Sequence, residues 1–317
     1  QSRREERRRG MSGIKKVQNR IEELEKMAAE AGIDISDELG RISAKVEKSS
    51  LSAGAWQRVE LARNPDRPRA LDVIDNICDD FIELHGDRHF GDDPAMVGGI
   101  GFIGGIAVTV IGNQKGRNLK ETMARNGGMA NPEGYRKALR LARQAEKFHR
   151  PIITLIDTQG AYPGLGAEER GIGEALAMNL REFSPLRTPI ICIVIGEGGS
   201  GGALGIGVGD KIYMLENAVY SVISPEGYAS ILLRDASLAR HAAAMMKITA
   251  EDILSLKVCN GIIREPAGGA HLDPAQASKS IREVILRDLK DLMPRNPAVL
   301  VRYRNQKIRK FGHFTEG

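Results

Sequence analysis

The sequence predicts an α/β fold in which helices cover a largely parallel sheet. Three short, continuously apolar runs, at 152–157, 190–195 and 211–215, have the length and composition of strands buried on both faces. The first two runs each lead into a glycine-rich turn and then a helical pattern, as expected of repeated strand–turn–helix units. With 42% hydrophobic and 27% charged residues among 317, the chain has the composition of a globular protein.

The first seventy or so residues are predicted to precede this core. Residues 1–13 form a basic tail, since residues 1–16 hold seven Lys and Arg against two Glu, which matches the +5 net charge of the whole chain. A disordered tail is the simpler interpretation, and an RNA-binding arm is the alternative. Within residues 14–70, apolar residues recur at helical spacing at 14–27 and 39–46, before the Pro- and Arg-rich stretch ARNPDRPRALD. This pattern predicts a helical hairpin followed by a linker.

The core itself is predicted to span residues 71–270. Apolar residues from Leu71 to Leu84 predict a first helix. The stretch AMVGGIGFIGGIAVTVIGNQ then predicts two strands joined by a tight turn at Gly104 and Gly105.

Two further helices have clear starting signals. Asn131 and Pro132 mark the beginning of a helix that runs to about Phe148, and Ser224 and Pro225 mark another. Residues 271–317 are charged and are predicted to form a C-terminal helical extension.

Composition narrows the functional classes. The three cysteines, Cys78, Cys192 and Cys259, are far apart and form no C-x-x-C pair, so we expect no metal site in this chain and a reducing, cytoplasmic setting. No apolar run approaches eighteen residues, so no membrane span is expected. Outside residues 1–16 the chain is neutral, and a nucleic-acid partner is therefore not favoured.

Eight glycines fall within the fourteen residues 196–209, in the stretch IICIVIGEGGSGGALGIGVGDKIYMLE. Gly196, Gly198 and Gly201 fit G-x-G-x-x-G, and Glu216 follows at the distance of a dinucleotide-binding fingerprint. That pattern makes an NAD-dependent oxidoreductase the alternative function. Its crossover helix, however, would contain the three glycines of 205–209, each costing roughly 0.5–1 kcal/mol relative to Ala.

A second glycine-rich turn, in IITLIDTQGAYPGLGAEERG, favours another interpretation. Turns at the ends of neighbouring strands can direct free backbone N–H groups into one cleft, which is what an oxyanion hole requires. A helix starting near Gly201 would add the positive end of its dipole. For any single glycine close packing is the simpler explanation, whereas the pairs Gly198–Gly199 and Gly201–Gly202 favour a functional role.

A hydrolase is a weaker alternative. The stretch GGSGG, centred on Ser200, fits the G-x-S-x-G nucleophile motif. None of the six histidines lies beside this serine in the sequence. Backbone donors without an evident acid–base side chain suit a reaction in which the substrate supplies its own base.

Several long motifs carry a family resemblance. They are, in order, GDRHFGDDPAMVGGIGF, GNQKGR, PEGYRKALRL, IDTQGAYPGLGAEERG, IGEGGSGGALGIG, SVISPEG and EPAGGAH. From about residue 24 to 287 the chain resembles the carboxyltransferase alpha subunits of bacterial acetyl-CoA carboxylase. The resemblance implies a ClpP/crotonase-like superhelix with helical N- and C-terminal extensions.

The resemblance also implies a reaction and its partners. The expected reaction transfers a carboxyl group from carboxybiotin, held on the biotin carboxyl carrier protein, to acetyl-CoA, giving malonyl-CoA for fatty-acid synthesis. The implied assembly is an α2β2 heterotetramer with a zinc-ribbon beta subunit, within a complex that includes biotin carboxylase. This chain would then hold half of an active site and no metal.

Site residues follow from the same resemblance. Gly201 and Gly202 are expected to form the oxyanion hole for the biotin urea oxygen. The sequence departs from the family at Gly127, where we expect an aromatic residue, and at Gln159, where we expect proline. The expected substrate-binding residues are Gly198, Gly199, Gly160, Ala161, Tyr162, Lys115 and Arg117. Lys115 and Arg117 would meet a phosphate or carboxylate of the substrate, and a solvated basic turn is an equally good interpretation of these two residues.

Overall fold

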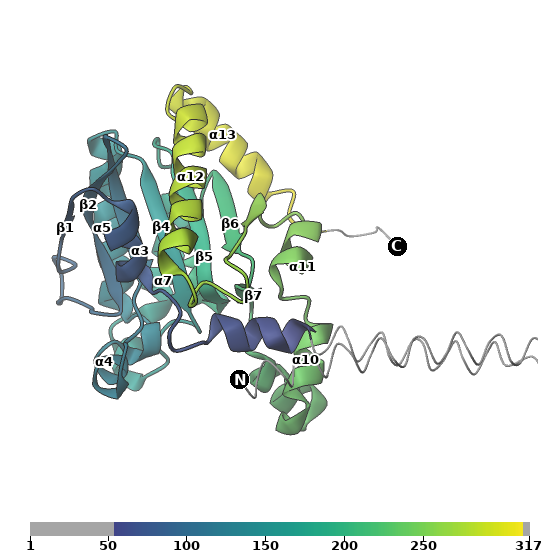
Figure 1. The fold of residues 1–317 in the computed structure, drawn as a ribbon. Helices are drawn as coiled ribbons and strands as arrows, with labels where there is room; N and C mark the ends of the chain where they lie inside the picture. Colours follow the sequence, from purple (N-terminus) through teal and green to yellow (C-terminus); the bar gives the residue numbers. More distant parts are fainter. Residues whose placement is uncertain (1–53, 313–317) are drawn as a thin grey trace, which may run out of the picture.

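A computed structural model describes residues 54–312 of the chain, and its arrangement is drawn in Figure 1. The predicted tail and helical hairpin therefore lie outside the described residues. A helix at 54–62 comes first. The remaining elements are, in order, α3 (Ala70–Ile77), β1 (Phe81–Glu83), β2 (Met96–Ile103), β3 (Ile106–Asn113), α4 (Leu119–Ala124), η1 (Asn126–Gly128), α5 (Pro132–Lys147), β4 (Ile152–Thr158), α6 (Leu165–Glu169), α7 (Ile172–Phe183), β5 (Ile190–Gly199), α8 (Ser200–Leu204), β6 (Lys211–Leu215), β7 (Val219–Ser221), α9 (Pro225–Tyr228), η2 (Ala229–Leu233), η3 (Ala236–Leu238), α10 (Ala239–Met245), α11 (Ala250–Ser255), β8 (Gly261–Ile263), α12 (Pro274–Leu292) and α13 (Pro297–Ile308).

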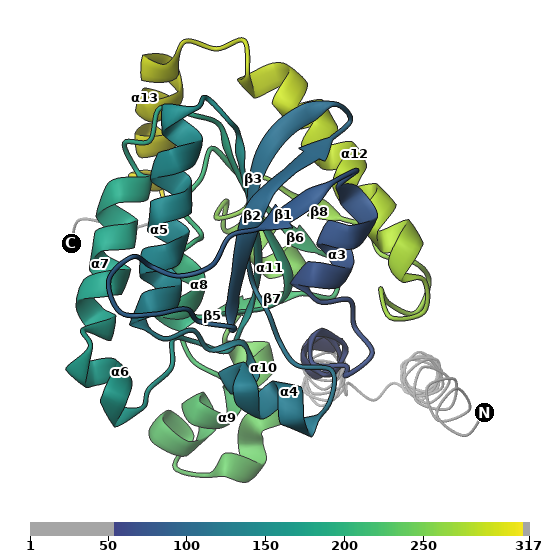
Figure 2. The same ribbon diagram turned by 90° about the vertical axis from the view of Figure 1, so that its left-hand side faces the viewer.

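The strands form a single sheet in the order β1-β2-β3-β4-β5-β6-β8, with β7 paired to the end of β5. The pairs β1–β2 and β2–β3 are antiparallel, and from β3 onward every pair is parallel. Helices α5 and α7 cover one face, and α3 and α12 cover the other (Figure 2). Every residue of β4 and β5 is buried, which confirms the predicted strands with two covered faces.

The predicted hairpin and helix starts are confirmed. Gly104 and Gly105 have φ of 58° and 78°, the left-handed conformation that a tight turn between β2 and β3 requires. Helix α5 starts at Pro132 after its N-cap Asn131. Ser224 caps α9 by accepting a hydrogen bond from the Gly227 N–H.

The predicted first helix is too long, because it ends at Ile77 and not at Leu84. Cys78 is extended, with φ of −93° and ψ of 137°, and the Asp79 N–H donates to the Phe102 carbonyl of β2. Phe81 therefore lies in β1, paired with Gly101. The apolar residues after Ile77 have helical spacing, but they form a strand because they pair with the edge of the sheet at β2.

The C-terminal extension is helical as predicted, but it also contributes to the core. Ile281, Ile285 and Leu289 of α12 and Leu300 of α13 belong to the main buried cluster. None of the helices described between residues 54 and 312 combines the length and hydropathy of a membrane span.

Candidate functional site

The two glycine-rich turns meet at the carboxyl ends of β4 and β5. The strands pair in parallel until Thr158 lies opposite Gly198. A Cβ added to Gly199 would overlap the Gln159 carbonyl, and one added to Gly202 would overlap the Gly160 backbone carbon. Glycine is therefore required at both positions for the turns to touch backbone to backbone. Ligands of open parallel sheets bind at this end of the strands.

Backbone N–H groups are available where β5 becomes α8. Gly199 is the N-cap and offers no side-chain cap, so the N–H groups of the first helical turn, which includes Gly201 and Gly202, have no partner within the helix. Ser200 turns the chain sharply, with φ of 50°. The expected dipole contribution is small, because α8 has only five residues.

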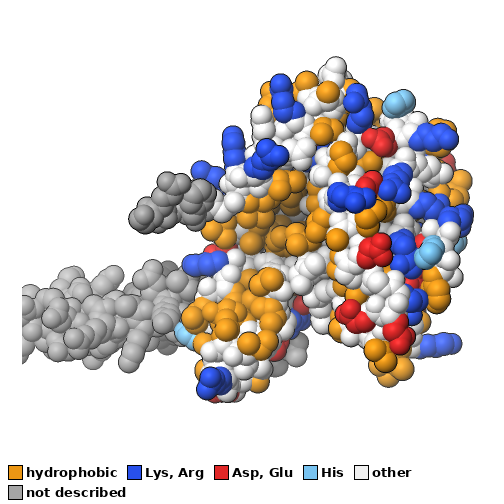
Figure 3. Space-filling model, turned by 180° about the vertical axis from the view of Figure 1, so that it is seen from behind, with side chains coloured by type: hydrophobic (Ala, Val, Ile, Leu, Met, Phe, Trp, Pro, Cys, Tyr) orange, Lys and Arg blue, Asp and Glu red, His pale blue; other side chains and the backbone are white. Residues whose placement is uncertain are grey.

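Gly201 borders an open hollow whose walls are largely apolar, with a volume of about 430 Å³. Figure 3 shows such a hollow, lined by hydrophobic side chains, on the face seen from behind. Its size falls in the range of small-molecule sites. Besides Ser200 and Gly201, the hollow is lined by Leu204, Tyr220, Ser221, Val222, Tyr228, Met246, Lys247, Ile248, Ile253, Leu256 and Val258.

Gly198 and Gly199 are closely packed, whereas the position of a Gly160 Cβ is open. A Cβ on Gly198 would overlap the Tyr220 ring, and Gly198 and Gly199 border a separate cavity of only about 20 Å³. The Gly160 N–H donates to Thr158 Oγ1 at 3.1 Å. These three residues therefore shape the site, and the Gly160 N–H is already engaged.

Ala161 and Tyr162 lie next along the same turn. The Tyr162 N–H donates to the Ala130 carbonyl at 3.0 Å, and both side chains are half-buried against the main core. Neither residue lines the apolar hollow. Of the predicted site residues, only Gly201 lines that hollow, and Gly202 lies behind it against the 160–161 backbone.

Lys115 and Arg117, predicted to meet a phosphate or carboxylate of the substrate, contact carboxylates of the chain itself. Lys115 Nζ lies 2.7 Å from Asp157 Oδ1 and 2.9 Å from Glu197 Oε2. Arg117 pairs with Asp72 on the surface. Burial opposes charge on Lys115, but the two carboxylates outweigh burial and raise its pKa.

An ion-pair network centred on the buried carboxylates of Asp157 and Glu197, which sequence reasoning missed, therefore holds the glycine segment. Arg63 Nε lies 2.6 Å from Glu197 Oε1, and its Nη1 lies 2.6 Å from Glu226 Oε1. The Glu197 N–H donates to Asp157 Oδ1. Glu197 directly precedes Gly198, so the network fixes the end of β5. The available signal was a carboxylate inside a strand-like glycine run, which requires a buried partner.

The linker also has a structural role that its composition did not indicate. Arg67 is 3% exposed, donates to the Ile195 carbonyl and pairs with Glu265 at 2.6 Å. This arginine joins the predicted linker to the middle of β5. Pro- and Arg-rich composition predicted a connection but could not reveal a buried anchor.

The Glu197 network predicts acid sensitivity. Burial would raise the pKa of Glu197, but Lys115 and Arg63 outweigh it and lower the pKa below its usual 4.5. A carboxylate with a lowered pKa stabilises the fold above 4.5, and this contribution is lost as the pH falls through the folded-state pKa. We therefore expect the free energy of unfolding to decline below about pH 4.5, and less steeply in Glu197→Gln.

Denaturant titrations across a pH series would measure this slope. Glu251→Gln is a suitable control, because the Glu251 side chain is 50% exposed and its ion pair with Arg58 is on the surface. Equal slopes for wild type and Glu197→Gln would contradict a stabilising role for the network.

The dinucleotide interpretation is wrong. Gly196 and Gly198 lie within β5, and α8 ends at Leu204, so no crossover helix of the required length follows. The Glu216 carboxylate accepts hydrogen bonds from Arg264 and from the Glu265 N–H. It holds the loop after β8 and does not stand free for a ribose.

The nucleophile motif at Ser200 is likewise incomplete. Its φ of 50° resembles the strained turn of a nucleophile elbow. Within residues 54–312, however, no hydrogen bond joins Ser200 to a histidine. The same residues hold no group of His, Cys, Asp and Glu side chains arranged to bind a metal ion.

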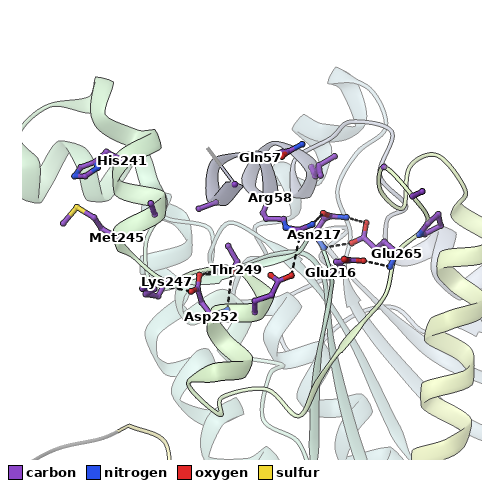
Figure 4. A pocket seen from close by; sticks show the side chains of 18 residues that line it. Gln57, Arg58, Glu216, Asn217, His241, Met245, Lys247, Thr249, Asp252 and Glu265 are labelled. Carbon is purple, nitrogen blue, oxygen red and sulfur yellow. Dashed lines mark hydrogen bonds and ion pairs between the residues drawn. The ribbon is translucent and has the colours of Figure 1, made fainter. Parts of the chain in front are cut away.

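A further cavity, of about 990 Å³, lies elsewhere. Figure 4 shows Gln57 and Arg58 of the 54–62 helix on one side, and His241 and Met245 of α10 on the other. Its charged groups are engaged with one another, as in the Arg58–Glu251 pair. Only Lys247 lines both this cavity and the apolar hollow.

The two departures from the family pattern are accommodated locally. Gly127 has φ of 63°, and no atom lies within 4 Å of the position its Cβ would take. Gln159 is exposed, and its carbonyl packs on Gly199. Neither change disrupts the contact between the two glycine-rich turns.

Comparisons with known proteins agree with this architecture. The family model described as acetyl co-enzyme A carboxylase carboxyltransferase-like matches residues 11–312. An acetyl-coenzyme A carboxylase carboxyl transferase subunit alpha from Treponema denticola is 70% identical over 298 residues, covering 94% of this chain and 98% of that protein. The corresponding Anoxybacillus flavithermus protein is 51% identical over 304 residues, covering 95% and 94%.

Solved structures show the fold. A Pseudomonas malonate decarboxylase hetero-tetramer in complex with coenzyme A matches with a TM-score of 0.60 at 17% identity, over 77% of this chain and 97% of that chain. Transcarboxylase 12S matches with a TM-score of 0.59 at 20% identity, over 71% and 41%. The predicted α/β, ClpP/crotonase-like fold is confirmed. With seven in ten residues shared with its Treponema relative, the chain belongs to the family of acetyl-coenzyme A carboxylase carboxyltransferase alpha subunits.

Proposed function

We propose that this chain supplies the biotin-binding half of a carboxyltransferase that converts acetyl-CoA to malonyl-CoA. The observation that carries the proposal is the backbone contact between the turns after β4 and β5, beside an apolar hollow, in a chain of this family. The malonate decarboxylase match, solved in complex with coenzyme A, is consistent with an acyl-CoA substrate.

The chain's own residues would act mainly through their backbone. Carboxybiotin on the carrier protein would supply the carboxyl group when bound. The N–H groups of Gly201 and Gly202 would hold its urea oxygen and stabilise negative charge there, as fixed donors do in an oxyanion hole. Apolar walls beside Gly201 would exclude water and strengthen those hydrogen bonds.

A second subunit would complete the site. Large apolar side chains are exposed on this part of the chain. Val222, which lines the hollow, is 79% exposed, and Ile231 and Leu232, in η2 directly after α9, are 66% and 63% exposed. Exposed apolar patches of this kind mark protein interfaces. We assign this face to the beta subunit of an α2β2 assembly, with the biotin carboxyl carrier protein approaching the same cleft and biotin carboxylase in the larger complex.

The reverse reaction tests this proposal. Malonyl-CoA decarboxylation dependent on biocytin is expected only after the chain is mixed with its cognate beta subunit. Assaying each subunit alone and the mixture, with assembly confirmed by light scattering, separates failure of assembly from failure of chemistry. An assembled complex that remains inactive would disprove the proposed reaction.

A further inference from the structure

Another concave site lies beside α5 and α7, and arginine is the commonest residue in its lining. It encloses about 630 Å³ between the loop at 85–92, α5 and α7, and shares no lining residue with the apolar hollow. Figure 3 shows Lys and Arg side chains gathered on the side of the molecule where α5 and α7 lie. Its lining includes five arginines: Arg88, Arg136, Arg140, Arg143 and Arg170.

Three of these arginines have carboxylate partners. Arg136 of α5 lies 2.8 Å from Asp87 of the loop. Arg170, which follows α6, lies 3.0 Å from Glu133 of α5. Arg143 of α5 lies 2.9 Å from Glu182 of α7. These pairs hold α5, α7 and the 85–92 loop together. The remaining two, Arg88 and Arg140, form no ion pair with a carboxylate among the described residues, although Asp92 and Asp87 favour the charge of Arg140 from a distance.

Arg88 and Arg140 donate to the same backbone oxygen. Arg88 Nη1 lies 2.9 Å from the His85 carbonyl, and Arg140 Nη2 lies 3.3 Å from it, while Arg140 Nε reaches the Gly86 carbonyl at 2.9 Å. Two guanidinium groups are thus held close together by neutral acceptors. Burial and the charge of Arg88 lower the pKa of Arg140, which agrees with mutual repulsion.

The loop carboxylates Asp92 and Asp87 favour the charge of Arg140 but are engaged with other donors. Asp92 accepts hydrogen bonds from the Gly86 N–H and from Lys137 Nζ. Asp87 accepts hydrogen bonds from the N–H groups of His89, Phe90 and Gly91, as well as from Arg136. Burial opposes its charge, but these bonds lower the pKa of Asp87 to about 2. Asp87 is therefore committed to shaping the loop, and Glu174 of α7 is the other carboxylate in the lining.

We propose that this arginine-lined cavity binds a phosphate-bearing small molecule between Arg88 and Arg140. Planar guanidinium groups recognise phosphate by paired hydrogen bonds, and an anion between them would remove their repulsion. The concave shape and the volume suit a small ligand. This inference does not depend on the proposed carboxyl transfer.

Calorimetric titration of pyrophosphate into the full-length chain, at ionic strength fixed with chloride, tests the site directly. We expect saturable binding at one site per chain. Arg88→Gln and Arg140→Gln should each weaken binding about tenfold or more, because each removes a charged hydrogen-bond donor to the ligand. Arg302→Gln, which removes an equal charge from the exposed face of α13, should bind as the wild type does.

Two variants keep the test decisive. Arg140→Gln also loses a contact to Gly86, whereas Arg88→Gln loses only one hydrogen bond, to the His85 carbonyl, and should keep the wild-type unfolding midpoint. Displacement of pyrophosphate by coenzyme A would identify a nucleotide-bearing ligand, and its failure would restrict the site to smaller phosphates; both support the site. No saturable binding, or equal affinity in a folded Arg88→Gln chain, would overturn the proposal. Binding is measured without turnover, so either result leaves the proposed carboxyl transfer unaffected.

Discussion

Gly202→Ala is expected to lower the turnover of the assembled complex by about 10²-fold or more, the effect of losing an oxyanion donor. The added Cβ would overlap the backbone of Gly160 and Ala161, which is not the flexible end of a side chain and cannot swing away. Either α8 or the turn after β4 must shift, and the Gly201 and Gly202 N–H groups shift with them. Gly202→Val should have at least the same effect. Because the lost interaction belongs to the transition state, kcat should fall more than KM rises.

Two matched variants locate the cause. Gly173→Ala adds a methyl group on α7 where no atom lies within 4 Å, and should preserve both turnover and stability. Gly201→Ala meets only Leu176 Cδ1, at 3.4 Å, so it should fold normally while placing a methyl group at the edge of the hollow. Gly202→Ala, in contrast, should also lose about 1–3 kcal/mol of stability through overpacking. Wild-type kcat in an intact Gly202→Ala complex would refute the oxyanion assignment.

The sequence predicted the features that depend on local pattern. Strands β4 and β5 were visible because both of their faces are buried, which demands continuous apolar residues. The start of α5 was visible because Asn131 and Pro132 act on adjacent backbone. The meeting of the two glycine-rich turns followed from the parallel order of neighbouring strands.

Features that depend on residues far apart in sequence could not be predicted. The partners of Lys115 are Asp157 on β4 and Glu197 on β5. Because both are distant in sequence, the basic turn that contains Lys115 was interpreted as a substrate-binding loop. Phe81 fitted helical spacing equally well, and only its pairing with Gly101 of β2 decided for a strand. The spacing of apolar residues predicts which face of a helix or strand is buried, but it does not identify the distant residues that pack against that face.

At the opposite end of β5, Arg304→Met is expected to lower the free energy of unfolding by about 3–5 kcal/mol, the cost of breaking a buried ion pair. Arg304 is 1% exposed and contacts Asp210 through Nε at 3.0 Å and Nη2 at 2.8 Å. It also donates to the carbonyls of Phe183, Leu186 and Thr188. Methionine would fill much of the volume but leave all of these acceptors without their donor.

Through Asp210, the loss of Arg304 should destabilise the start of β5 in particular. Its Oδ2 also accepts the N–H of Ile190, the first residue of β5, at 2.8 Å. Chemical denaturation should therefore show the loss in Arg304→Met, whereas Arg302→Met on the exposed face of α13 should stay within about 0.5 kcal/mol of wild type. Turnover per folded complex should be unchanged, because the glycines lie at the far end of β5. If turnover per folded Arg304→Met complex fell as well, the two ends of this strand would be coupled.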